Sequence, residues 1–146
     1  MKRFHFPLQT ALRWRNERAL AEEMKLERLT AERQAHEKAL TALLDRRARA
    51  ERSVLEAPFV EAADLCALDA FRLQASAECV RIRTRAAGCD ARIATQRSLL
   101  VEARRQARLL ENLREKRRQE WTRSFDAELE QNAGELFLAA HVRARD

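Results

Sequence analysis

Apolar residues recur at alternating intervals of four and three between Ala75 and Leu110. We call these core positions the second stripe: Ala75, Cys79, Ile82, Ala86, Cys89, Ile93, Gln96, Leu100, Ala103, Ala107 and Leu110. All but Gln96 are apolar, and arginines fill many of the positions between them. This spacing is typical of a coiled coil. A helix with so narrow an apolar stripe cannot bury it alone, so we expect it to lie along another helix.

An earlier segment carries a weaker heptad pattern, which we call the first stripe. Its positions are Leu8, Leu12, Arg15, Ala19, Glu22, Leu26, Leu29, Arg33, His36, Leu40, Leu43, Arg47, Ala50, Val54 and Ala57. Arginines, a glutamate and His36 interrupt it, yet the period persists over the whole segment. We interpret His36 as a polar core residue that helps to fix the register.

Pro58 separates the two stripes and is expected to end the first helix, because proline cannot donate a backbone hydrogen bond and clashes with the preceding turn. Asp64 is a candidate cap for the second helix. The sequence therefore predicts an all-α fold: a long antiparallel two-helix coiled-coil hairpin forming a single elongated domain over 1–146. We expect helices over 8–57 and 65–140, a bend at 58–64, and opposing residue numbers that sum to roughly 120 to 135.

Beyond Leu110 the apolar residues fall mostly four apart, and by the expected register the first helix covers its partner only to about residue 120. An overhanging C-terminal helical tail is therefore expected, with Trp121, Phe125 and Leu129 in line. Two interpretations stay open for this line. Either it contacts a partner protein, or Phe4 and Phe6 from the lead-in fold over it.

Composition supports long helices, because 36% of the residues are charged and the chain has only two glycines and two prolines to reverse its direction. The formal charge of +6 is spread over interleaved acidic and basic residues, as on a solvated coiled coil. A nucleic-acid-binding protein remains an alternative, with Arg104 to Arg123 as its best segment. The second stripe, however, lies N-terminal to that basic block, the reverse of a leucine-zipper arrangement.

Candidate chemistry is sparse. The three cysteines have no C-x-x-C spacing; Cys79 and Cys89 are interpreted as small core residues and Cys66 lies near the bend. His5, His36 and His141 are scattered, so neither a metal site nor a cofactor is expected. No Gly-rich phosphate loop or catalytic set indicates an enzyme. No apolar run has the length of a membrane span or signal peptide, so a cytoplasmic protein is expected.

Two segments resemble the flagellar export protein FliJ family. The first is the opening Phe6-Pro7-Leu8-Gln9, followed by Leu12 and Arg15. The second is the block from Leu109 to Trp121, Leu-Leu-Glu-Asn-Leu-Arg-Glu-Lys-Arg-Arg-Gln-Glu-Trp. The family has an F-x-L-Q opening and an L-x-x-L-R/K-E-K-R-R-x-E-aromatic block in the same order and at similar spacing, although its block usually ends in tyrosine.

The resemblance implies a non-enzymatic stalk that is similar to the stalk subunit of rotary ATPases. Its partners would be the hexameric flagellar export ATPase and the cytoplasmic domain of the export gate protein, which would hold it at the inner membrane; export chaperones are an open question. The implied ATPase-binding residues are Leu8, Leu12, Arg114, Arg117, Arg118 and Trp121, adjoined by Phe125. The implied gate contact is Phe71, with Ala75 four positions later. An unrelated coiled-coil scaffold is the remaining alternative.

Overall fold

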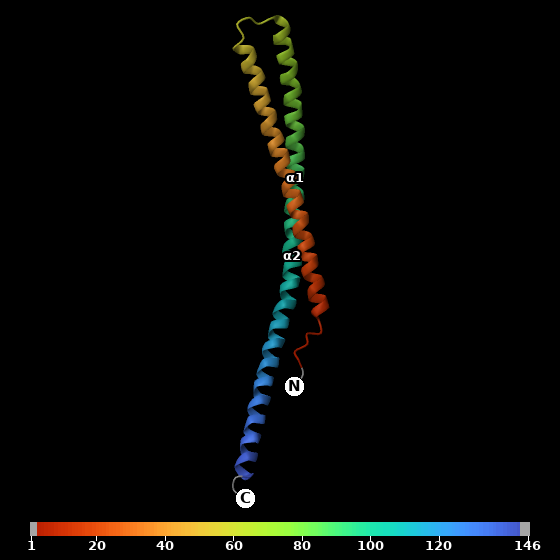
Figure 1. The fold of residues 1–146 in the computed structure, drawn as a ribbon. Helices are drawn as coiled ribbons and strands as arrows, with labels where there is room; N and C mark the ends of the chain where they lie inside the picture. Colours follow the sequence, from red (N-terminus) through yellow and green to blue (C-terminus); the bar gives the residue numbers. More distant parts are fainter. Residues whose placement is uncertain (1–2, 144–146) are drawn as a thin grey trace. The chain divides into compact units, whose positions relative to one another are not determined.

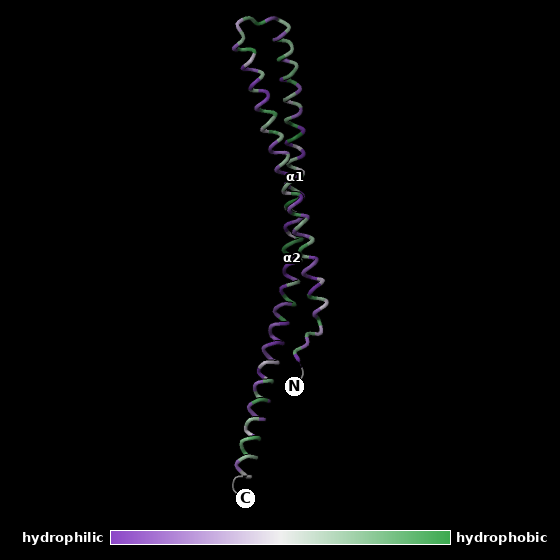
Figure 2. Tube along the Cα trace, in the orientation of Figure 1, coloured by the Kyte–Doolittle hydropathy of each residue, from purple (hydrophilic) through white to green (hydrophobic). Residues whose placement is uncertain are grey.

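The computed structural model of the protein describes residues 3–143 and contains two helices, α1 (Gln9–Leu55) and α2 (Ala62–Arg143). The two helices pack together as an all-α helical hairpin, as the stripes predicted (Figure 1). Hydrophobic and hydrophilic residues alternate along both helices instead of forming separate blocks (Figure 2). By contact the chain divides into two compact units, one of Leu20–Val101 and one that combines Met1–Ala19 with Glu102–Asp146.

Both ends of α1 lie inside the predicted range of 8–57. Pro7 and Leu8 form a turn before the helix, and the Gln9 N–H donates to the Phe6 carbonyl at 3.1 Å. At the other end, α1 stops at Leu55, earlier than predicted. Proline disfavours a helical conformation in the residue before it, so the helix ends ahead of Ala57 and Pro58.

The start of α2 differs from the prediction of residue 65, because the helix begins at Ala62. The Asp64 carboxylate accepts a hydrogen bond from the Glu61 N–H at 3.0 Å, while the Glu61 carbonyl accepts from Leu65 N–H at 3.3 Å. Asp64 therefore caps the helix from within its first turn, as the acidic member of a capping box does. Its negative charge is also favourable at the positive end of the helix dipole.

In the unit formed by residues 20–101, the core is the second stripe. Ala75, Cys79, Ile82, Cys89, Ile93, Gln96 and Leu100 are buried. The residues of the first stripe in this unit are half-buried. This asymmetry follows from side-chain size, because the α2 positions are often alanine or cysteine while α1 supplies larger leucines and long polar side chains that reach past the interface.

Cross-helix ion pairs show the antiparallel register of this unit. The Arg33 Nε lies 2.9 Å from Asp90 Oδ1, the Arg72 Nε lies 2.8 Å from Glu51 Oε1, and the Arg92 Nη2 lies 2.7 Å from Glu32 Oε1. In each pair the residue numbers sum to a value within the predicted range. The predicted register is therefore confirmed here.

The buried amide of Gln96 is satisfied by the partner helix. Its Nε2 donates to the backbone carbonyl of Glu22 at 3.0 Å and to the Glu22 carboxylate. Gln96 is the polar position of the second stripe and Glu22 is a polar position of the first. The two interruptions thus face each other and remove the cost of a buried, unpaired amide.

In the unit formed by residues 1–19 and 102–146, Leu12 is only 2% exposed and Ala103 and Ala107 are buried. The Arg15 guanidinium donates to the Gln106 side-chain carbonyl, which brings the start of α1 against this part of α2. Farther along α2, residues 126–141 are all exposed, including the large side chains of Leu136 and Phe137. A helical tail therefore continues beyond the covered stretch, as expected.

Candidate functional site

The first candidate site is an open groove of about 750 Å³, which we call the aromatic groove. One wall is the lead-in to α1 and the other is a stretch of α2. Its lining residues are Arg3, Phe4, His5, Phe6, Pro7, Leu8, Leu113, Arg117, Glu120, Trp121 and Ser124. The groove therefore joins two sequence segments that lie about a hundred residues apart.

Aromatic side chains organise the groove. The Phe4 ring lies 6.0 Å from the Trp121 ring at a tilt of 57°, and Trp121 stacks on Phe125 at 5.0 Å. Phe6 is buried. Tilted and offset ring pairs at these separations are favourable beyond the area that they bury. The Phe4 ring therefore packs against Trp121, as the second of the two interpretations predicts, but Trp121 stays half-buried and Leu129 is exposed.

The basic side chains beside the groove face solvent. Arg114, Arg117 and Arg118 are all exposed. Arg117 Nη1 lies 3.2 Å from Glu120 Oε2, with both side chains more than half exposed. Exposed pairs of this kind add little to folding stability. These arginines are therefore accessible to an acidic surface on another molecule.

The predicted ATPase-binding residues occupy two different environments. Leu8 is 41% exposed at the rim of the groove, and Trp121 and Phe125 are half-buried. Leu12 instead belongs to the core between the helices. A direct contact with a partner would thus use Leu8, the arginines and the aromatic residues, while Leu12 would act by holding α1 in place.

The predicted gate contact falls in the other unit. Phe71 is half-buried beside a smaller hollow of about 440 Å³, which Leu43, Gln74 and Glu78 also line. Ala75 also lines this hollow but is only 2% exposed. Of the two predicted residues, only Phe71 offers substantial surface to a partner.

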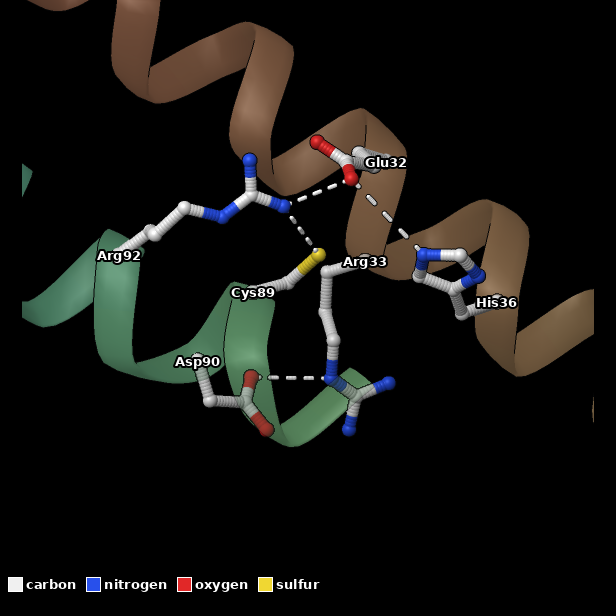
Figure 3. Close-up of polar contacts among 6 residues, drawn as sticks. All are labelled: Glu32, Arg33, His36, Cys89, Asp90 and Arg92. Carbon is white, nitrogen blue, oxygen red and sulfur yellow. Dashed lines mark hydrogen bonds and ion pairs between the residues drawn. The ribbon is translucent and has the colours of Figure 1, made fainter. Parts of the chain in front are cut away.

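A polar cluster crosses the helix interface around Cys89 (Figure 3). Arg92 Nη2 donates to Glu32 Oε1 at 2.7 Å and to Cys89 Sγ at 3.1 Å. His36 Nε2 lies 3.9 Å from the same Glu32 oxygen, and Cys89 is completely buried. The pKa of Glu32 is lowered, first by the hydrogen bond from Arg92 and then by the one with Cys89. The hydrogen bond between Arg92 and Glu32 also raises the pKa of Arg92.

This cluster was missed at the sequence level. His36 has no cysteine or histidine nearby in the sequence, so no local ligand motif marks the cluster. Yet His36 and Cys89 both occupy stripe positions, and their numbers satisfy the expected antiparallel register. The signal was therefore present in the pairing of the stripes, not in any local motif.

No protein-family model, curated protein or solved structure matches this chain. Across the residues that the structure describes, neither helix contains a stretch both long and apolar enough to cross a membrane.

Proposed function

We propose that the protein is a non-enzymatic stalk and adaptor of the flagellar type III export apparatus. It would bind the hexameric export ATPase through the aromatic groove and its neighbouring arginines, and the cytoplasmic domain of the export gate through the surface around Phe71. In this proposal the protein works in the cytoplasm and reaches the inner membrane only through these partners.

One observation carries the proposal. The two segments that resemble the FliJ family lie at opposite ends of the sequence, yet Phe6, Pro7 and Leu8 line the same groove as Leu113, Arg117 and Trp121. A coiled coil does not require its two end segments to form a common surface with exposed charges and half-buried aromatic rings. A surface of this composition suits a protein partner, since aromatic and arginine side chains contribute strongly to binding.

The test reverses the charge of the three arginines beside the groove, by replacing Arg114, Arg117 and Arg118 together with glutamate; we call this the basic-block variant. The matched control reverses Arg81, Arg83 and Arg85, which are also exposed on α2 and include an equivalent i,i+3 pair, from Arg81 to Glu78 at 3.3 Å. Both variants should keep their helicity, measured by circular dichroism, because exposed charges contribute little to folding.

We expect the first variant alone to lose both binding to the export ATPase and stimulation of ATP hydrolysis. If both variants lost binding and stimulation equally, the effect would come from net charge alone, and a role for the groove would be contradicted. For the gate, Phe71→Ala should weaken binding to the cytoplasmic gate domain, whereas Leu73→Ala, which truncates an exposed leucine two residues away, should not.

The same pair of variants tests the nucleic-acid alternative. A DNA-binding basic segment would give the parent protein a gel shift that weakens steeply with salt, and the basic-block variant would lose that shift. We expect no such shift. Its appearance together with unchanged ATPase stimulation would replace the stalk proposal.

A further inference from the structure

Glu32, His36 and Cys89 form a mixed set of metal-ligand groups outside the aromatic groove. One ligand atom from each, a carboxylate oxygen, an imidazole nitrogen and a thiol sulfur, lies within 4.8 Å of the other two. Glu32 and His36 are one helical turn apart on α1, so they project from the same face, and Cys89 comes from α2 (Figure 3). The set therefore spans both helices.

A cationic group already sits among these ligands. The Arg92 nitrogen lies 2.7 Å from the Glu32 oxygen and 3.1 Å from the Cys89 sulfur, which is where a bound cation would contact both atoms. The Arg92 side chain is about half exposed, so it can rotate into solvent while the buried core residues keep their packing. The cluster thus has the electrostatic character of a cation site with an easily displaced occupant.

We propose that Glu32, His36 and Cys89 bind one zinc ion that bridges α1 and α2. Sulfur, nitrogen and oxygen ligands together suit zinc, which is commonly held by cysteine, histidine and carboxylate in tetrahedral sites. Zinc bonds of about 2.0 to 2.3 Å place tetrahedral ligand atoms roughly 3.5 Å apart. The three groups therefore need to close by at most about 1.3 Å from their separation of 4.8 Å or less. This movement falls to the Glu32 and His36 side chains, because Cys89 is completely buried in the interface.

On binding, the Cys89 thiol releases its proton to solvent and forms the zinc–sulfur bond, Arg92 leaves, and water completes the coordination. The ion links the two helices, so it stabilises the hairpin as a ligand that binds only the folded chain. This inference does not depend on the proposed export function, and either one can fail without the other.

Cobalt(II) is the probe, because cobalt–thiolate coordination gives a charge-transfer absorption that carboxylate and imidazole ligands alone do not. The full chain is titrated in a background of Cys66→Ser and Cys79→Ala, where Cys89 is the only thiol. We expect one cobalt per chain, a thiolate band, and loss of the band when zinc is added. Absence of a thiolate band would overturn the proposal.

Substitutions assign the ligands. Cys89→Ala should abolish the band, and His36→Asn and Glu32→Gln should each weaken cobalt binding at least tenfold. Glu37→Gln is the matched control, since Glu37 is an exposed carboxylate on α1 outside the cluster, and it should leave the affinity unchanged. Arg92→Ala should tighten binding because it removes the competing cation. Insensitivity to His36→Asn and Glu32→Gln, or weaker binding by Arg92→Ala, would overturn the site.

The otherwise unaltered chain gives a second measurement, which does not require the variant with both Cys66 and Cys79 replaced to fold. Zinc is titrated against a chromophoric chelator with the parent protein, Cys89→Ala and Cys79→Ala. Both are single truncations of buried cysteines on the second stripe, so they are matched for packing. Loss of competition only in Cys89→Ala supports the site, and equal competition by all three proteins contradicts it.

Discussion

Leu12 provides the most direct test of the hairpin, because it is the large side chain of α1 that the interface buries most completely, at 2% exposed. The Leu12→Ala substitution removes three carbon atoms from a buried site on α1. At about 0.8 kcal/mol per buried methylene, the lost transfer free energy is about 2.4 kcal/mol. A residual cavity adds to this cost, so we expect a loss of about 3 kcal/mol in the free energy of unfolding.

The control is Leu20→Ala, which makes the same chemical change on the same helix at a leucine that is 58% exposed. Its cost should stay within about 0.5 kcal/mol, as for other surface substitutions. Urea denaturation followed by helical circular dichroism measures both values. Equal destabilisation by the two substitutions would mean that Leu12 is not in the core, and would refute the register in this part of the hairpin.

Two further predictions concern an ion pair and the aromatic groove. Hydrogen bonds from Arg47 and then Arg72 lower the pKa of Glu51 below 4.5, so the Glu51 carboxylate stabilises the fold above that pH and loses this contribution as the pH falls through its folded-state pKa. Glu51→Gln should therefore flatten the decline in thermal stability below about pH 4.5. An unchanged decline would contradict this role of Glu51. With Trp14 replaced by phenylalanine, Phe4→Ala should shift Trp121 emission to the red, whereas Phe59→Ala at the exposed bend should not; identical spectra would mean that Phe4 does not cover the indole.

Most of the fold could be predicted from the heptad spacing. Every position of the second stripe is buried or half-buried, and so is every position of the first stripe except Leu8. This success has a physical cause: one narrow apolar stripe on each helix leaves a single face that can be buried, so the face and the antiparallel pairing follow together. The helix ends were less accurate, because Pro58 acts on residues before it and Asp64 acts on Glu61.

The sites were predictable only in part. The segments of the resemblance lie in both walls of the aromatic groove. The sequence offered the packing of the lead-in onto Trp121 as one of two interpretations, but the heptad spacing could not choose between them, because the lead-in lies outside the heptads. Leu12 and Ala75 were assigned to partner contacts although their stripe positions already predicted burial. For these two residues, the pattern of the chain itself was the better guide to their environment.

The polar interruptions of the first stripe explain how so simple a hairpin selects one register. Three of them contact α2 directly: Arg15 contacts Gln106, Glu22 contacts Gln96, and Arg33 pairs with Asp90. The other two pair one turn away within α1, His36 with Glu32 and Arg47 with Glu51.

Apolar positions alone would not make this choice, because a slip of one heptad sets alanine, cysteine or leucine against similar residues at little cost. The same slip would leave the buried Gln96 amide opposite a different residue, and an unsatisfied buried donor costs about 1 to 3 kcal/mol. It would also separate Arg33 from Asp90 and His36 from Cys89. Arg15, Glu22 and Arg33, which weaken the first stripe as a hydrophobic surface, are thus residues that specify its alignment, as polar core residues do in coiled coils.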